Sequence, residues 1–248
     1  MIKTINLTKK YGDRTVVDNL NLEIQSGELF SLLGVNGAGK TTTIKMLTTL
    51  VKPTSGEILV DNINPFKDSS IKERMNISPQ ESAIALNLTI EENLSFILGV
   101  YGIKNKTKKI NELITLFSLE EYRNKRAKTL SGGYKRRLSI AMALANEPKI
   151  LFLDEPTLGL DVLSRIELWK IISSLKGKTT IILTTHYMEE AEKLSSKIGI
   201  LQNGKLKIVG TAQEIIKSAN ATTFEDAFVK LCTGESLWIW YLILLKEI

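Results

Sequence analysis

The sequence contains only one cysteine and one histidine among its 248 residues. A single cysteine, Cys232, excludes a disulfide within the chain and fits a reducing compartment. With His186 as the only histidine, the chain also lacks the ligands of a structural or catalytic zinc site. The single cysteine and the single histidine therefore exclude a secreted domain stabilised by disulfides and a zinc enzyme.

Long apolar runs are also missing. No stretch approaches the roughly 20 apolar residues of a membrane-spanning helix. Residues 1–5 are predicted to begin a strand at once and carry no apolar core of a signal peptide. We therefore expect a cytoplasmic protein that has no membrane span of its own.

The charge balance is basic, with a net charge of +6. Basic proteins often bind nucleic acid or anionic lipid. The lysines are dispersed, however, apart from the group Lys104, Lys106, Lys108 and Lys109, and few aromatic residues lie between them. We expect an ordinary lysine-rich surface and no nucleic-acid partner, with attraction to a membrane surface as the alternative.

A phosphate-binding motif occupies residues 34–41, here called the phosphate cradle, and matches G-x-x-x-x-G-K-[ST] without a mismatch. A predicted buried strand at 28–33 precedes it and a predicted helix at 41–50 follows, which is the context that this motif requires. Glycines let backbone N–H groups turn toward phosphate, and a helix N-terminus adds partial positive charge. Lys40 is predicted to reach the β- and γ-phosphates and Thr41 to ligate Mg²⁺. The predicted nucleotide-binding residues of this segment are Gly34, Asn36, Gly37, Ala38, Gly39, Lys40, Thr41 and Thr42.

Two adjacent acids, Asp154 and Glu155, follow the apolar run at 150–153. Such a run is typical of a buried parallel strand, and ligands of open α/β sheets bind beyond the carboxyl ends of these strands. We predict that Asp154 holds Mg²⁺ through water and that Glu155 orients or deprotonates the attacking water. A solvated strand end is the alternative, and the matched cradle argues against it.

The order of predicted elements indicates an α/β fold with a mostly parallel core sheet, an N-terminal antiparallel β part and a helical insert. Strands surround the cradle in residues 2–82, and residues 83–130 take helical spacing, with a capping box at Thr89 and Glu92. Residues 131–236 return to alternating strands and helices, with a hairpin at 202–205 and two short helices at 211–233. We expect one domain over residues 1–236.

A second glycine motif, Leu130-Ser131-Gly132-Gly133, stands in a single copy after the insert, where Ser131 can cap the next helix. One copy of each motif suggests half an ATP site on each of two faces, and hence closure as a dimer. With these motifs, residues 2–234 resemble the ATP-binding cassette (ABC) family. The resemblance implies the P-loop fold of the ABC ATPases. The resemblance rests on motifs in the family's order, including the signature at 130–134, the loop Leu158-Gly159-Leu160-Asp161 and His186.

The resemblance implies a role for several further residues. Tyr11 is similar to the aromatic residue that stacks on adenine, and Gln80 to the glutamine that reaches Mg²⁺ and senses the partner subunit. His186 is similar to the histidine that contacts the γ-phosphate, and Asp161 belongs to the loop that crosses to the other subunit. In the signature, Ser131, Gly132 and Gly133 are intact, but Tyr134 stands where the family commonly has glutamine.

The family further implies a subunit that binds ATP and Mg²⁺, hydrolyses ATP and drives a separate transmembrane permease. Two copies would form a homodimer at the inner face of the cell membrane, in peripheral contact with the membrane through the permease. The local sequences at 78–81 and 159–162 look most like those of ATPases from bacterial exporters of drugs, antibiotics or polysaccharides. A soluble ABC ATPase that acts on ribosomes or DNA, and an inactive regulatory module, are the alternatives.

Nine apolar residues in a row, at 237–245, lie beyond the part that resembles the family. A helix of that length covers about 13 Å, against roughly 30 Å of hydrocarbon in a bilayer. Three interpretations stay open for residues 237–248: a helix buried against the domain, an interfacial anchor or docking segment, and an altered or truncated reading frame.

Overall fold

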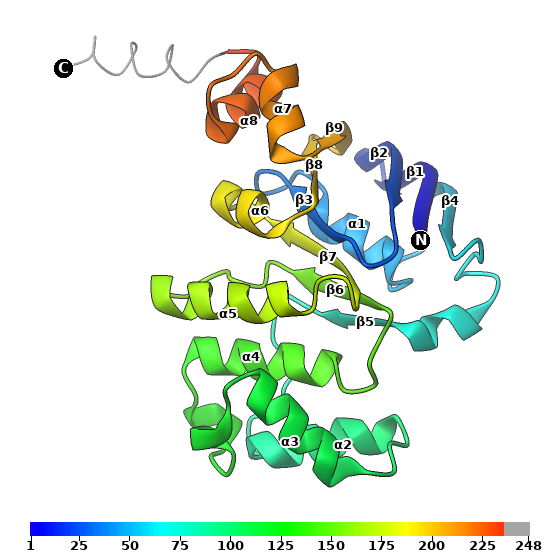
Figure 1. Cartoon of the computed structure of the whole chain (residues 1–248). Helices are drawn as coiled ribbons and strands as arrows, with labels where there is room; N and C mark the ends of the chain where they lie inside the picture. Colours follow the sequence, from blue (N-terminus) through cyan, green and yellow to red (C-terminus); the bar gives the residue numbers. More distant parts are fainter. Residues whose placement is uncertain (236–248) are drawn as a thin grey trace.

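The structure, a computed structural model, describes residues 1–235, and the apolar tail at 237–248 lies outside the described residues. A three-stranded antiparallel sheet has the order β2-β1-β4, formed by Arg14–Ile24, Ile2–Tyr11 and Ser55–Val60. A six-stranded sheet has the order β5-β6-β7-β3-β8-β9 (Figure 1). Its strands are β3 Leu29–Leu33, β5 Met75–Ser78, β6 Ile150–Asp154, β7 Thr180–Thr185, β8 Lys197–Gln202 and β9 Lys205–Gly210.

The large sheet is parallel from β5 to β8, and only β9 runs antiparallel to its neighbour. The predicted α/β class is therefore confirmed, together with the antiparallel N-terminal part. The β8–β9 hairpin turns through Asn203 and Gly204, both with positive φ, as a two-residue Asn-Gly turn requires.

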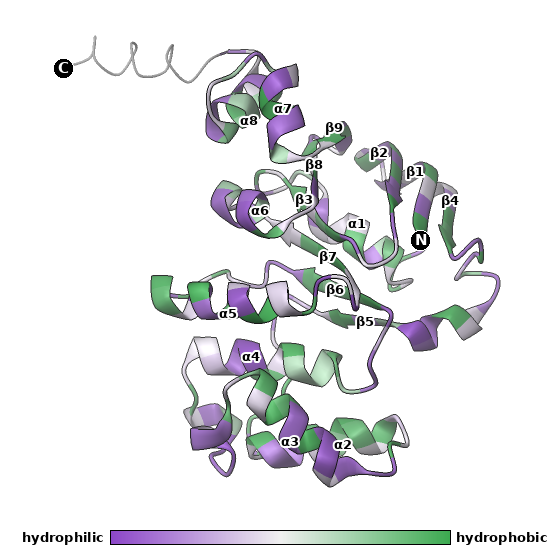
Figure 2. Cartoon of the chain, in the orientation of Figure 1, coloured by the Kyte–Doolittle hydropathy of each residue, from purple (hydrophilic) through white to green (hydrophobic). Residues whose placement is uncertain are grey.

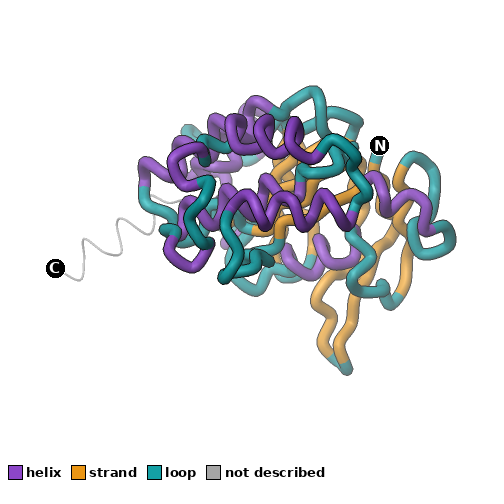
Figure 3. Tube along the Cα trace, turned by 90° about the horizontal axis from the view of Figure 1, so that it is seen from below, coloured by secondary structure: helices purple, strands orange, loops and turns teal. Residues whose placement is uncertain are grey.

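The central strands bury both of their faces, which explains their continuous apolar sequence. Leu151 and Leu153 of β6 pack in one cluster with the helical insert, whereas Phe152 packs in another with α1 (Lys40–Leu47) and the small sheet. A third cluster joins β8 to the C-terminal helices. In Figure 2, β6 and β7 carry the green of hydrophobic residues. Figure 3, seen from below, shows helices in purple lying across the orange strands.

Helix ends follow local capping chemistry. Helix α2 (Ile90–Val100) begins at the predicted capping box of Thr89 and Glu92, and α4 (Gly132–Ala143) begins at Ser131. Helix α1 ends at Leu47, so the predicted end at residue 50 is wrong, because Thr49 takes a positive φ of 62°. The other helices are α3 Lys106–Leu116, α5 Val162–Ser174, α6 Met188–Leu194, α7 Ala212–Ser218 and α8 Phe224–Thr233, and short 3₁₀ turns are η1 Ser69–Arg74, η2 Glu120–Tyr122 and η3 Ala127–Thr129.

The register of the parallel strands brings their carboxyl ends to one edge. Ser78 pairs with Leu153, Asp154 with Thr184, and Leu33 with Thr185. The segments that leave these strands therefore start side by side, although they are far apart in sequence. Within residues 1–235, no helix is long and apolar enough to cross a membrane.

Candidate active site

A cavity of about 540 Å³ opens at this edge of the sheet. It receives side chains from the phosphate cradle, from the segments after β5, β6 and β7, and from the β1–β2 hairpin. The lining residues are Tyr11, Arg14, Val16, Asn36, Gly37, Gly39, Lys40, Thr41, Thr42, Gln80, Glu155, Leu158 and His186. Gly34 and Ala38, also predicted to contact nucleotide, are buried and are not among the lining residues.

Lys40 lies at the base of the cavity with its side chain 3% exposed. Its ammonium group donates hydrogen bonds to the carbonyl oxygens of Gly34 at 2.7 Å and Val35 at 3.2 Å. It also forms an ion pair with Glu155 Oε1 at 3.3 Å. A buried ammonium needs such partners, because an unpaired charge in the interior is costly. The cation is thus fixed inside the cradle, where phosphate oxygens can replace its present acceptors.

Glu155 is the first residue after β6 and takes a left-handed backbone conformation with φ 46°, which is uncommon for a residue other than glycine. Its backbone N–H donates to the carbonyl oxygen of Thr184 at 3.1 Å and to the Thr184 hydroxyl at 3.0 Å, which supports this conformation. The carboxylate joins the two other functional groups: Oε1 faces Lys40, and Oε2 lies 2.9 Å from His186 Nδ1. Lys40, Glu155 and His186 therefore form one connected cluster.

Oxygen ligands suited to a hard cation lie next to this cluster. The Thr41 hydroxyl donates to Asp154 Oδ1 at 3.2 Å, and the Thr184 hydroxyl donates to the same oxygen. Gln80 lines the same cavity. Mg²⁺ is commonly bound by one or two carboxylates together with substrate phosphates. The donor set of Thr41, Asp154 and Gln80 fits such an ion. The described residues hold no group of three or more His, Cys, Asp or Glu side chains that would bind a metal without phosphate.

The β1–β2 hairpin also contributes side chains to the cavity. Tyr11 is 50% exposed and presents its ring there, with Lys9 Nζ 4.9 Å from the ring centre. Arg14, directly opposite Tyr11 in the strand register, and Val16 were not predicted from the sequence. Residues opposite each other in an antiparallel pair share a face, so the two-residue turn between Tyr11 and Arg14 was the available signal.

The signature residues lie elsewhere. Ser131 and Gly132 are exposed at the start of α4, and the Ser131 hydroxyl accepts the Tyr134 N–H at 3.5 Å. Tyr134 packs against Tyr122 with ring centres 4.2 Å apart. Asp161 caps α5 through Ser164, a bond that holds the pKa of Asp161 below its usual value. Neither the signature nor Asp161 is among the residues that line the cavity. Ser131, Gly132 and Asp161 are exposed, whereas Gly133 is buried.

The similarity to known proteins agrees with this arrangement. A family model described as ABC transporter matches residues 17–158. The chain is 42% identical over 241 residues to the probable multidrug ABC transporter ATP-binding protein YbhF of Escherichia coli, covering 93% of this chain but 41% of that protein. It is 39% identical over 218 residues to the Nod factor export ATP-binding protein I of Cupriavidus metallidurans, covering 86% of this chain and 72% of that protein.

Solved structures give the same result. An ATP-binding subunit of an ABC transporter superposes with a TM-score of 0.83 at 28% identity, covering 93% of this chain and 99% of that one. The dimeric cassette MJ0796, in a post-hydrolysis state bound to ADP and phosphate, superposes with a TM-score of 0.76 at 29% identity, covering 85% and 98% of the two chains.

Proposed function

We propose that this chain, which belongs to the ABC transporter family, powers export through a separate membrane permease by binding and hydrolysing ATP. The observation that carries the proposal is the cluster of Lys40, Glu155 and His186 beside Thr41 and Asp154. It supplies a cation for phosphate, a base for water and oxygen ligands for a metal ion. Each is required for phosphoryl transfer to water.

Each residue of the cluster has a chemical role in this proposal. Lys40 exchanges the Gly34 and Val35 carbonyls for phosphate oxygens, and its charge stabilises the phosphates. Thr41 and Asp154, with Gln80, hold Mg²⁺, which would neutralise charge that develops on the phosphates. Glu155 accepts a proton from water or orients it, and His186, 2.9 Å away, fixes the carboxylate. Tyr11 offers its exposed ring to the base of the nucleotide.

The position of the signature supports a homodimer with two shared nucleotide sites. Ser131 and Gly132 are exposed at the start of α4 and are not among the residues that line the cavity of their own chain. A helix N-terminus favours an anion, and the nucleotide of a second copy would supply one. Closure of two copies would then place each signature against the partner's nucleotide.

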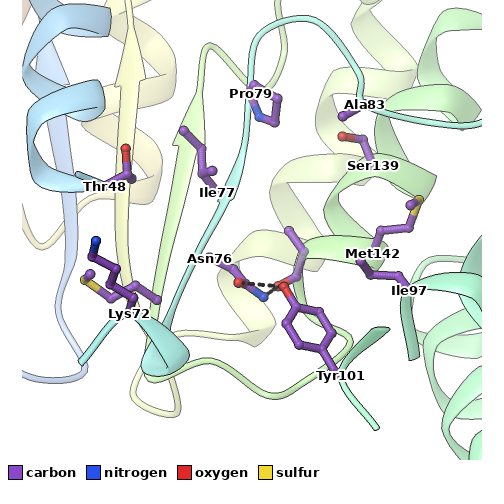
Figure 4. Close-up of a pocket in the computed structure, with 12 residues that line it drawn as sticks. Thr48, Lys72, Asn76, Ile77, Pro79, Ala83, Ile97, Tyr101, Ser139 and Met142 are labelled. Atoms are coloured by element: carbon purple, nitrogen blue, oxygen red, sulfur yellow. Dashed lines mark hydrogen bonds between the residues drawn. The ribbon is translucent and has the colours of Figure 1, made fainter. Parts of the chain in front are cut away.

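A groove of about 250 Å³ beside the Gln80 loop suits the permease (Figure 4). Its walls come from β5, α2 and α4, and Asn76 and Tyr101 are bonded across it at 2.9 Å. Phe96 and Val100 of α2 do not line the groove, but they are 62% and 64% exposed and lie one helical turn apart, beside the groove residues Ile97 and Tyr101. Pro79 lines the groove and directly precedes Gln80, so a segment docked there would contact the nucleotide site through one residue.

The names of the relatives support the direction of transport. The relative from Escherichia coli is named as a probable multidrug transporter protein, and the relative from Cupriavidus metallidurans is named as a Nod factor export protein. The chain covers only 41% of the length of YbhF. The location that follows is the inner face of the cell membrane, in contact with the permease.

Membrane vesicles from the source cell provide the test. We expect the purified chain to hydrolyse ATP and the vesicles to raise its turnover several-fold, whereas Glu155→Gln stays inactive in both conditions. Phe96→Ser should lose the stimulation and keep the turnover measured without vesicles. Stimulation by ribosomes or DNA instead of vesicles would overturn the transport proposal, and absence of any ATP turnover would overturn the enzymatic one.

A further inference from the structure

Arg136 lies in α4, five residues after Ser131, and is 5% exposed. Its guanidinium group donates to backbone carbonyl oxygens from two separate segments. Nε donates to Pro156 at 3.0 Å and Nη2 to Asp154 at 2.8 Å. Nη1 donates to Pro79, and to Gln80 at 3.5 Å. One side chain on the signature helix therefore binds the ends of both β5 and β6.

The bonded carbonyls belong to the segments that carry the proposed chemistry. Pro79 and Gln80 begin the loop after β5, and the Gln80 side chain lines the cavity. Asp154 and Pro156 flank Glu155 on either side. A planar guanidinium can donate in several fixed directions at once, whereas a lysine ammonium is a point charge on a flexible stem. An arginine can therefore bond both segments at once, which the single ammonium group of a lysine would do less well.

A buried cation at this place is costly for stability alone. Desolvation lowers the pKa of Arg136 to about 10, against the attraction of Asp154 and Glu190, so the group is still charged at neutral pH. Glu190 is itself buried and accepts bonds from Thr157 and Trp169. Replacement of buried charges by apolar side chains of similar volume is often neutral or stabilising. What the arginine adds beyond an apolar side chain of similar volume is its set of bonds to the two segments.

We propose that Arg136 is a positioning residue that ties the Gln80 loop and the Asp154–Glu155 strand end to the signature helix. Arg136 would then set where the signature helix lies relative to the Gln80 loop and to Glu155 of the same chain. Loss of this tie would leave nucleotide binding in the cradle intact and impair closure of the dimer. The inference rests on the proposed function, because it assumes that two copies close over nucleotide.

The test uses Arg136→Lys in the Glu155→Gln background, where hydrolysis does not consume the nucleotide. Two quantities are measured: ATP affinity in EDTA by calorimetry, and the dissociation constant of the dimer formed with ATP and Mg²⁺ by sedimentation. Because Arg136 touches no residue of the cradle, ATP affinity in EDTA should stay within about twofold. The dimer constant should rise at least about tenfold, since bonds donated by a charged group are lost. Arg136→Gln is measured in parallel, and it removes the charge as well.

Arg123→Lys is the matched control. Arg123 binds Glu91 through two nitrogens within the helical insert and touches neither the cavity nor the signature. It should leave both quantities unchanged. If the Arg136 variants dimerise as the parent does, the inference is overturned while the proposed function stands. If ATP affinity in EDTA and the unfolding temperature fall together, Arg136 has only a folding role. If the Glu155→Gln parent itself does not dimerise, the proposed closure is wrong and this inference falls with it.

Discussion

At the scale of single residues, Glu155 is held in place through both its backbone and its side chain. Its backbone is left-handed, its N–H is bonded twice to Thr184, and its carboxylate contacts both Lys40 and His186. Because Lys40 forms an ion pair with this carboxylate, phosphate must compete with Glu155 for the same cation. The residue that we assign to water is therefore also the residue that opposes phosphate binding.

Replacing Glu155 with glutamine should separate these two effects. We expect turnover to fall by about 10²–10⁴-fold, as is typical when a general base is removed. ATP affinity should be kept or increased, because the neutral amide no longer holds Lys40 or repels phosphate. Phosphate release and calorimetry measure the two quantities. Glu189→Gln, an exposed glutamate paired with Lys193, is the control, and near wild-type turnover in Glu155→Gln would remove Glu155 from the mechanism.

Lys40→Ala should lose nucleotide affinity. Lys40 is the only side-chain cation in the cradle, and hydrogen bonds to charged groups contribute about 1.5–3 kcal/mol each. We therefore expect at least about a tenfold weaker dissociation constant for ATP in calorimetry. Lys45→Ala, an exposed lysine on the same helix, should bind ATP as the wild type does. Equal affinity in the two variants would refute the role of Lys40.

At the scale of elements, an aromatic pair joins the first turn of α4 to the helical insert. Tyr134 packs on Tyr122 of η2, and the Arg137 guanidinium lies 5.0 Å from the Tyr134 ring centre. Burial raises the pKa of the Tyr134 hydroxyl, as expected for a ring packed between neighbours. The tyrosine that stands in the place of the family's glutamine therefore contributes packing to the position of the signature.

Two substitutions of Tyr134 test this contribution. Tyr134→Phe keeps the ring and should leave the unfolding temperature and the ATP-dependent dimer unchanged. Tyr134→Ala removes an aromatic contact that is worth about 0.5–1.5 kcal/mol beyond its buried area. It should lower the free energy of unfolding in urea and weaken the dimer. If Tyr134→Phe weakens the dimer as much as Tyr134→Ala does, the hydroxyl is the active group and the packing interpretation is wrong.

Most elements were predictable because their causes are local. Apolar runs predicted the buried strands, and the helical spacing of residues 83–130 predicted the helices α2 and α3 of the insert. Thr89 with Glu92 predicted the start of α2. The end of α1 was not predictable from apolar residues, because Thr49 leaves the helix through its backbone angle.

The residues of the site likewise divide into those that local motifs predict and those that only the folded chain brings together. Contiguous motifs predicted most residues of the cavity, since each motif follows a strand of the parallel sheet. Arg14 follows only once the hairpin register is known. The bond from Arg136 to Pro79 joins segments 57 residues apart in sequence, and no local pattern encodes such a contact. Gly34 is predicted by the motif, but it serves the cradle as an acceptor for Lys40 and as a close neighbour of Leu201.

At the scale of the whole molecule, one chain carries a nucleotide cavity and a signature at separate places. Arg136 links the two inside the chain, and the dimer proposed above links them between chains. A defect in the cradle and a defect in the signature should therefore complement each other only in part. This arrangement allows a test that mixes two inactive variants.

Ser131→Arg should place a long cation where the partner's nucleotide sits and so block closure, while ATP still binds in the cradle of the same chain. Mixed with Lys40→Ala, it forms dimers with one intact composite site and one site in which both halves are defective. We expect each variant alone to stay monomeric with ATP, and the mixture to form some ATP-dependent dimer in sedimentation when both carry Glu155→Gln. Ser174→Arg, an exposed position at the end of α5, is the matched control and should dimerise normally. A dimer of Ser131→Arg alone would show that the signature does not meet the partner's nucleotide. If the mixture gives no dimer although the control does, either both composite sites must be intact for closure or the trans arrangement is wrong.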